Sequence, residues 1–204
     1  MKYIIHRGIT SNKTKENTYE SIKKAVKDKT AAGVEFDIRL TKDKKIVLSH
    51  NSLINMKKIE DTNYIDIIKE KYLTTLDKIL SIETNKIFLI DIKVNNNYKI
   101  FGDTLIKYLN NCNKNIYLCS FNKKIINYLK RISKYKLAYI LFKYKKNKND
   151  FIMVNYKGIS NKKITSIKNK EIFLWTINNN KELKIIKNKF TNIENYYLIT
   201  DKKE

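Results

Sequence analysis

Charged side chains occur at alternate positions in two short apolar runs of the sequence. Glu35 and Asp37 lie in one run, and Asp91 is followed two residues later by Lys93 in the other. Because successive side chains of a strand point to opposite faces, the members of each pair share one face. Three converging carboxylates repel each other unless cations compensate, and hard oxygen donors suit Mg²⁺ or Ca²⁺. The two pairs therefore indicate a divalent-cation site beside an amine, although either pair alone also fits an exposed, solvated strand face.

The sequence contains two histidines, His6 and His50, and each falls at the end of a predicted strand. In a barrel of parallel strands, catalytic groups collect at that end. A lone histidine is more often structural, but here both histidines of the chain occupy such positions. Two imidazoles that flank a metal site can act as general base and general acid near neutral pH.

Short apolar runs alternate with stretches of helical periodicity along the chain. The predicted strands are Tyr3–His6, Val34–Ile38, Ile46–His50, Ile87–Ile92, Ile116–Ser120, Leu137–Leu141, Phe151–Val154, Ile172–Ile177 and Tyr197–Thr200. The predicted helices are Thr18–Lys29, Thr75–Ile82, Tyr98–Asn111, Lys123–Ile132, Lys162–Lys168 and Lys181–Lys187. Asn17, followed by Glu20, predicts the N-cap of the first helix and its N3 partner.

A repeating strand–helix order predicts a mainly parallel sheet with helices outside it. About eight such units favour a compact (β/α)8 TIM barrel over an open sheet, with a short insertion after the second strand. The polar stretch Lys143–Asp150 is predicted to be a loop. No repeat or flexible linker divides the chain, so we expect one domain over residues 1–204.

Basic side chains dominate the charge of this 204-residue chain, in which 43 Lys and Arg against 20 Asp and Glu give a net charge of +23. Only Arg7, Arg39 and Arg131 are arginines, whereas proteins that read nucleic acid rely on arginine forks for bidentate contacts. The composition therefore argues against a nucleic-acid partner and indicates a solvated lysine coat. A second interpretation stays open, in which the charge attracts anionic substrates and allows weak association with acidic membranes.

No apolar run approaches the roughly 20 residues needed to span a bilayer, and the amino end lacks the features of a signal peptide. Cys112 and Cys119 are too few for a disulfide framework and lack metal-ligand spacing. We therefore expect a reduced, cytoplasmic setting.

A series of short motifs follows one another along the chain. They are His6-Arg7-Gly8, Glu16-Asn17-Thr18, Glu35-Phe36-Asp37, Thr41-Lys42-Asp43, Ser49-His50, Asp91-Ile92-Lys93, Ser120-Phe121, Trp175-Thr176-Ile177-Asn178 and Thr200-Asp201. Each motif is weak alone, but the ordered set resembles the glycerophosphodiester phosphodiesterase family over essentially the whole chain. The resemblance implies a (β/α)8 barrel that hydrolyses glycerophosphodiesters to sn-glycerol 3-phosphate and an alcohol, using a divalent cation.

The resemblance also implies roles for individual residues, carried over by position. The implied metal ligands are Glu35, Asp37 and Asp91; the acid–base pair is His6 and His50; the phosphate-binding residues are Arg7 and Lys93; and the pocket-lining residues, for glycerol or the leaving group, are Phe121 and Trp175. Glu16 would orient the histidine or the arginine, and Asn17 is expected only to cap the helix.

Two positions depart from the family pattern. The third acidic ligand is usually glutamate, and Asp91 is one methylene shorter, so a backbone shift or a bridging water must complete the ligand set. The family's His-Asp is here His50-Asn51. A neutral amide replaces a carboxylate that would raise the basicity of the histidine, so we expect a lower pKa for His50.

Two alternative functions remain open at the level of sequence. The first is a lysophospholipase D-type phosphodiesterase, but no amphipathic apolar insertion is visible that could bind acyl chains. The second is a catalytically weak barrel that binds anionic ligands, against which the complete set of histidines, cations and carboxylates argues.

Overall fold

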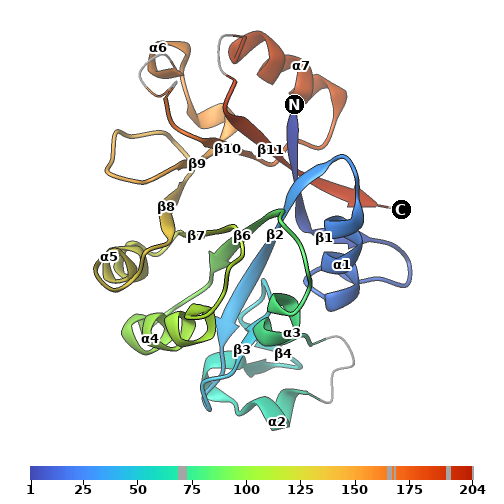
Figure 1. Ribbon diagram of the computed structural model, residues 1–204, viewed down its shortest axis with the longest axis vertical. Helices are drawn as coiled ribbons and strands as arrows, with labels where there is room; N and C mark the ends of the chain where they lie inside the picture. The colour runs from blue at the N-terminus through green and yellow to red at the C-terminus, as the bar shows by residue number, and fades with distance from the viewer. Residues whose placement is uncertain (69–72, 165–166, 168, 192–193, 204) are drawn as a thin grey trace.

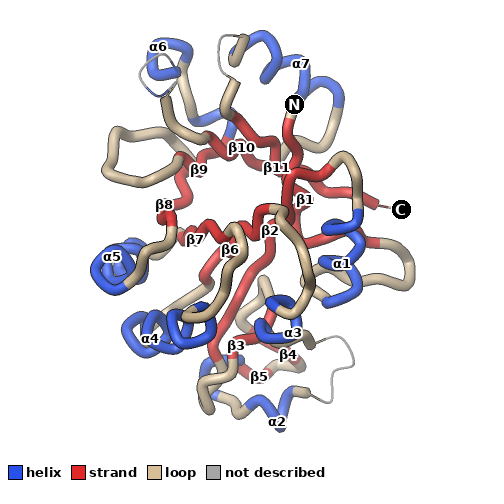
Figure 2. The backbone as a smooth tube through the Cα atoms, viewed as in Figure 1, coloured by secondary structure: helices blue, strands red, loops and turns tan. Residues whose placement is uncertain are grey.

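A computed structural model describes residues 1–68, 73–164, 167, 169–191 and 194–203. Eight parallel strands form a closed ring, in which each strand pairs with the next and the last pairs with the first. They are β1 (Lys2–Thr10), β2 (Ala31–Leu40), β6 (Ile87–Ile92), β7 (Ile116–Ser120), β8 (Lys136–Leu141), β9 (Ile152–Asn155), β10 (Ile172–Trp175) and β11 (Tyr196–Lys203). The ring and its outer helices are visible in Figures 1 and 2. The predicted (β/α)8 barrel is thus confirmed.

Helices cover the outside of the ring (Figure 2). They are α1 (Tyr19–Lys27), α3 (Leu76–Leu80), α4 (Tyr98–Leu109), α5 (Lys123–Ile132), α6 (Asn161–Ile164) and α7 (Asn180–Lys189). The predicted helix Lys162–Lys168 coincides with α6 only at its beginning, and residues 165, 166 and 168 lie outside the described residues. Residues 142–151, which join β8 to β9, contain no helix, as predicted for the polar stretch Lys143–Asp150.

The insertion after the second barrel strand contains β3 (Ile46–Leu48), β4 (Leu53–Ile54), β5 (Lys57–Lys58), the 3-10 helix η1 (Ile59–Asp61) and α2 (Tyr64–Ile67). β3 pairs antiparallel with β2, so the predicted strand Ile46–His50 is a strand only to Leu48 and does not join the ring. Val47, Ile59 and Ile67 form a small core of their own in this insertion.

The N-cap predicted for the first helix is wrong by one residue. Thr18 caps α1, accepting a hydrogen bond from the backbone N–H of Ser21, whose hydroxyl accepts one from the Thr18 N–H in return. Asn17 precedes the cap with a positive φ of 55°. Asparagine tolerates this left-handed conformation better than most residues, and the conformation turns its side chain toward the barrel instead of the helix.

The barrel interior is closed by large side chains below the acidic residues. Tyr117, Phe151, Phe173 and Tyr197 belong to one buried cluster with ring centroids 4.5 to 5.3 Å apart along the chain of contacts. A side chain that points inward near the carboxyl end of a strand therefore faces a cavity whose floor is apolar. No helix in the described part of the chain is long and apolar enough to cross a membrane.

Candidate active site

A cavity of about 180 Å³ lies at the carboxyl ends of the barrel strands, where it is expected for this fold. Nine of the ten site residues predicted from sequence line it: His6, Arg7, Glu35, Asp37, His50, Asp91, Lys93, Phe121 and Trp175. The tenth, Glu16, stands behind Arg7 and accepts a hydrogen bond from its Nη1 at 3.0 Å. The structure thus brings together residues that are up to 169 positions apart in the chain.

The three predicted metal ligands converge in the barrel interior. Asp37 on β2 is directly opposite Asp91 on β6, and Glu35 lies two residues earlier on the same face of β2. Ligand oxygens of the three carboxylates lie within 4.8 Å of one another, and all three residues are at least 95% buried. The shorter Asp91 side chain therefore reaches the cluster, although its family counterpart is usually a glutamate.

The pKa values of these three carboxyls shift in different directions, because burial and mutual repulsion raise them and neighbouring cations lower them. Burial, reinforced by the Asp37 charge, raises the pKa of Glu35 to about 8, and burial raises the pKa of Asp91 to about 6. Burial also opposes ionisation of Asp37, but Lys93 and Arg7 outweigh it and lower the pKa of this carboxyl. Asp37 is consequently the carboxyl that ionises most readily, whereas Glu35 and Asp91 need further positive charge to ionise fully.

Two permanent cations are held against the carboxylates. Lys93 Nζ lies 2.6 Å from Asp91 Oδ2 and 3.1 Å from Asp37 Oδ1. Arg7 Nε lies 3.1 Å from Asp37 Oδ2. Because Lys93 is shared between two carboxylates, it offsets only part of the burial of Asp91. Burial opposes protonation of Lys93, but its two partners outweigh burial and raise its pKa, so the ammonium stays charged.

The turn that carries Arg7 requires a glycine at the next position. Gly8 has φ +86°, and a Cβ there would lie 2.5 Å from the backbone carbon of Ser21. Arg7 itself has a positive φ of 54°, and the pairing of β1 with β11 shifts register between Ile5 and Ile9. This irregularity within β1 also points the Arg7 backbone N–H at Glu35 Oε2, 3.2 Å away.

His6 lies between two carboxylates in the middle of β1, at the irregularity between Ile5 and Ile9. Its Nδ1 is 2.6 Å from Asp201 Oδ1 and its Nε2 is 3.7 Å from Glu35 Oε2. Asn178 donates to the other oxygen of Asp201 at 2.6 Å and accepts from its backbone N–H at 2.9 Å. Burial opposes protonation of His6, but Glu35 and Asp201 outweigh burial and raise the pKa of the imidazole.

His50 follows β3 and faces the same cavity from the insertion. Its backbone carbonyl accepts hydrogen bonds from Arg39 at 2.7 Å and 3.2 Å, which tie the loop to β2. Its Nδ1 is 3.3 Å from Asn51 Oδ1. Burial, together with the charges of Arg7 and Lys93, lowers the pKa of His50 although Asp37 opposes the shift. The contact with Asn51 raises the pKa of His50, so the lowering comes from burial and the two cations and not from the amide.

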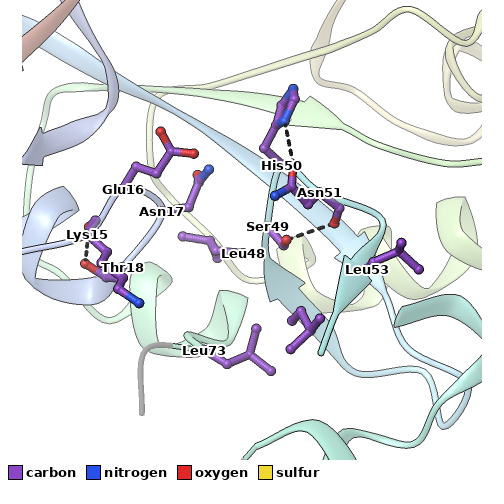
Figure 3. A pocket seen from close by; sticks show the side chains of 11 residues that line it. Lys15, Glu16, Asn17, Thr18, Leu48, Ser49, His50, Asn51, Leu53 and Leu73 are labelled. Carbon is purple, nitrogen blue, oxygen red and sulfur yellow. Dashed lines mark hydrogen bonds between the residues drawn. The ribbon is translucent and has the colours of Figure 1, made fainter. Parts of the chain in front are cut away.

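A second cavity, of about 260 Å³, shares His50 with the first. Glu16 and Asn17 line one side of it, and His50, Asn51 and Leu53 line the other (Figure 3). His50 therefore lines both cavities at the rim of the barrel.

Two aromatic side chains contribute to the apolar part of the cavity wall, together with Ile140, Met153 and Ile199. Phe121 and Trp175 line it, as predicted, and lie 6.0 Å apart edge to face. Lys93 Nζ lies 5.6 Å from the centre of the Phe121 ring. An apolar wall opposite charged groups suits a substrate with both a phosphate and a carbon skeleton.

Sequence reasoning missed the role of Asn17. It was expected only to cap a helix, but its amide donates to Asp37 Oδ2 at 2.9 Å and accepts from the Asp37 backbone N–H at 3.0 Å. Asp201, Asn178 and Arg39 were also assigned no function. The first two lie in motifs that signal the family, whereas an arginine in an apolar strand was the only signal for Arg39.

Comparisons with known proteins agree with this fold. A glycerophosphodiester phosphodiesterase from Thermotoga maritima superposes with a TM-score of 0.77 at 24% identity, covering 98% of this chain and 95% of that one. A phosphodiesterase from Oleispira antarctica, solved in complex with the product sn-glycerol-3-phosphate, gives a TM-score of 0.84 at 14% identity, covering 98% and 93%. These likenesses show a shared fold. A search of curated proteins found no match.

The family-level evidence comes from the sequence as a whole. The model of the glycerophosphoryl diester phosphodiesterase family matches residues 6–201, a range that starts at His6 and ends at Asp201, the two residues that meet where β1 pairs with β11. Because this match spans nearly all of its 204 residues, the chain belongs to the glycerophosphoryl diester phosphodiesterase family and is a phosphodiester hydrolase.

Proposed function

We propose that the protein hydrolyses glycerophosphodiesters to sn-glycerol 3-phosphate and an alcohol, with a divalent cation held by Glu35, Asp37 and Asp91. The observation that carries this proposal is the convergence of three buried carboxylates, two cations and two histidines on one cavity. The Oleispira antarctica phosphodiesterase, with the same fold, binds the same product. The substrate is accordingly a small molecule, and residues 1–204 are proposed to act as one domain.

The carboxylate cluster fits Mg²⁺ or Ca²⁺. Asp91 Oδ1 is buried and has no hydrogen-bond partner among the described residues, so one hard donor is left over after Lys93 is satisfied. The three carboxylates outnumber the two cations beside them, and the raised pKa values of Glu35 and Asp91 mark a shortage of positive charge. When bound, a divalent cation supplies positive charge to the phosphate oxygens that gain charge in the reaction.

Arg7 and Lys93 are proposed to bind the phosphodiester. Both line the cavity and both are paired with carboxylates that hold them in place. Preorganised cations stabilise the charge that develops on the phosphate without having to reorient during the reaction. Glu16 contributes by fixing the guanidinium of Arg7 from behind.

His6 and His50 are proposed to carry the protons. One imidazole takes a proton from the nucleophile, and the other gives a proton to the leaving oxygen. The Asp201 bond to Nδ1 leaves the Nε2 of His6 on the side of Glu35 and the cavity. Phe121 and Trp175 are proposed to hold the glycerol or the leaving group against their rings.

The setting of the enzyme is also part of the proposal. Cys112 and Cys119 are both free thiols, which supports a reducing, cytoplasmic environment. The net charge of +23 supports attraction of anionic substrates and of acidic lipid surfaces.

Turnover of glycerophosphocholine, followed by release of sn-glycerol 3-phosphate, tests the proposal. We expect EDTA to stop turnover and added Mg²⁺ or Ca²⁺ to restore it. Asp37→Ala should abolish both the activity and its dependence on the cation, whereas Asp66→Ala, an exposed carboxylate of α2, should behave as wild type. Turnover by Asp37→Ala that persists in EDTA would refute the metal assignment.

The histidines are tested by the same assay. His6→Ala and His50→Ala should each lower kcat by roughly 10² to 10⁴, the range of general acid–base groups. Both side chains face the cavity and not the packed core, so the variants should fold normally. A variant with nearly normal kcat would remove that histidine from the mechanism.

A further inference from the structure

The rim of the catalytic cavity carries an aromatic patch, and one of its rings, Phe142, has no part in the proposed reaction. Phe142, the first residue after β8, stacks on Phe121 at 5.2 Å and meets Trp175 edge to face at 5.2 Å. Phe142 is 68% exposed and Phe121 is 44% exposed. Phe121 and Trp175 line the cavity, but Phe142 does not. We call these three residues the aromatic rim.

Lysines surround the aromatic rim, and carboxylates are excluded from the same segments. The stretches that directly follow β6 to β10 are residues 93–97, 121–124, 142–146, 156–160 and 176–181, and they contain eight lysines and no Asp or Glu. Lys123, Lys143 and Lys157 in these stretches are all exposed. Asp150, at the far end of the β8–β9 loop, accepts a hydrogen bond from Leu137 at the start of β8, and so lies at the other end of the barrel.

The other side of the barrel mouth has a different charge pattern. The β1–α1 loop carries Glu16, and the insertion after β3 carries Glu60, Asp61 and Asp66. Lys93 is paired with carboxylates of the site and Glu182 follows the last of the stretches after β6 to β10, but the other seven lysines of those stretches are exposed. Positive charge is thus in excess on the half of the rim that also exposes aromatic rings. Exposed rings among lysines are the combination that binds at the interface of an anionic bilayer, because the rings enter the headgroup region while the ammonium groups approach lipid phosphates.

We propose that the aromatic rim and its lysines dock the protein on anionic lipid membranes, with the mouth of the catalytic cavity facing the lipid surface. Phe142 is the residue that enters the headgroup region furthest, since it is the most exposed of the three and has no place in the cavity. Attraction of the lysines to lipid phosphates makes the association dependent on ionic strength. The cavity then opens where phosphodiesters of lipid origin are concentrated.

Cosedimentation with vesicles tests this proposal directly. We expect the full chain to bind vesicles of phosphatidylglycerol and phosphatidylcholine at low salt, to bind pure phosphatidylcholine weakly, and to be released by high salt. Phe142→Ser should weaken binding roughly tenfold, as expected for one large apolar side chain withdrawn from the interface. Ile185→Ser on the outer face of α7 is the matched control, since Ile185 is a large apolar residue that is 44% exposed, and it should bind as wild type.

Trp175 reports the position of the contact, because it is the single tryptophan of the chain and belongs to the aromatic rim. Vesicles that contain brominated phospholipids should quench its fluorescence, and Phe142→Ser should reduce this quenching. Absence of binding to anionic vesicles would overturn the proposal, as would binding without quenching of Trp175. Loss of binding in Met56→Ser, at the 95% exposed tip of the β4–β5 hairpin, but not in Phe142→Ser would also overturn it, by placing the contact on the insertion.

Hydrolysis of soluble glycerophosphocholine separates the two proposals. Phe142→Ser should retain this activity, because the substrate in solution does not need the membrane. A protein that binds vesicles as expected but hydrolyses no glycerophosphodiester would refute the proposed function and leave the docking surface standing.

Discussion

Asn17 joins the first helix to the acidic cluster, and its replacement should separate two contributions to stability. Its amide makes two hydrogen bonds with Asp37, and its backbone has a left-handed φ of 55°. Asn17→Gly removes the amide but keeps the backbone conformation accessible. Asn17→Ala removes the amide and also places a Cβ in an unfavourable conformation.

The magnitude follows from these contacts. A hydrogen bond to a charged group contributes about 1.5–3 kcal/mol, and a buried N–H that loses its partner costs about 1–3 kcal/mol. Both bonds are buried, so we expect Asn17→Gly to lower the free energy of unfolding by about 3 kcal/mol. Asn17→Ala should be less stable by about 1 kcal/mol more, because alanine at positive φ is strained.

Urea unfolding at neutral pH measures the two free energies, and glycerophosphocholine turnover measures the effect on the site. A loss of the fixed orientation of Asp37 should reduce activity by about 10–100-fold in both folded variants, as for other residues that hold a metal ligand in place. Equal stabilities for Asn17→Gly and Asn17→Ala would refute the role of the left-handed backbone. Wild-type stability and activity in Asn17→Gly would refute the role of the amide.

Three further perturbations test neighbouring parts of the structure. Asn51→Asp should raise the pKa of His50, because an anionic partner stabilises the imidazolium at pH values below the raised pKa, and this stabilisation is lost as pH rises through it. One limb of the pH–rate profile should therefore move to higher pH. Superimposable profiles for the two proteins would exclude any influence of residue 51. Asp201→Ala should lower kcat by about 10–100-fold with little change in KM, because it removes the hydrogen bond that orients His6. Partial recovery of kcat in Asp201→Asn would show that Asp201 positions His6 and does not merely support folding. Hydrogen bonds to the Asp28 carboxylate lower its pKa, so its contribution to stability is present at neutral pH and is lost as pH falls through the lowered pKa. The free energy of unfolding of Asp28→Asn should therefore decrease less in acid than that of the wild type. Unfolding at a series of pH values measures this difference.

The insertion shows where local pattern and tertiary partner diverge. Residues 46–48 have the apolar composition of a barrel strand and do form β3, but β3 pairs antiparallel with β2 at the edge of the ring. Strand propensity depends on side chains within a few residues, whereas the choice of partner depends on how the whole ring closes. The pattern could therefore predict the strand and not its place.

The acidic cluster could be predicted from the sequence because it depends on the two-residue alternation of side chains along a β-strand. Strand geometry alone puts Glu35 and Asp37 on one face, and any parallel barrel brings the carboxyl ends of its strands to one mouth. The position of Asp37 opposite Asp91 could not be predicted without the register of β2 against β6. The resemblance to the family supplied the roles of the histidines, which spacing alone left open.

Other partners at the site depended on closure of the barrel. Asp201 lies 195 residues from His6 in sequence, and the two meet only because β11 pairs with β1. Asn17 has the side chain of a helix cap, and only the left-handed turn before α1 directs it to Asp37 instead. Alternation and capping act between neighbours in the chain, so the sequence by itself determines them; contacts between distant segments form only when the eight strands close into a ring, so the tertiary structure decides them.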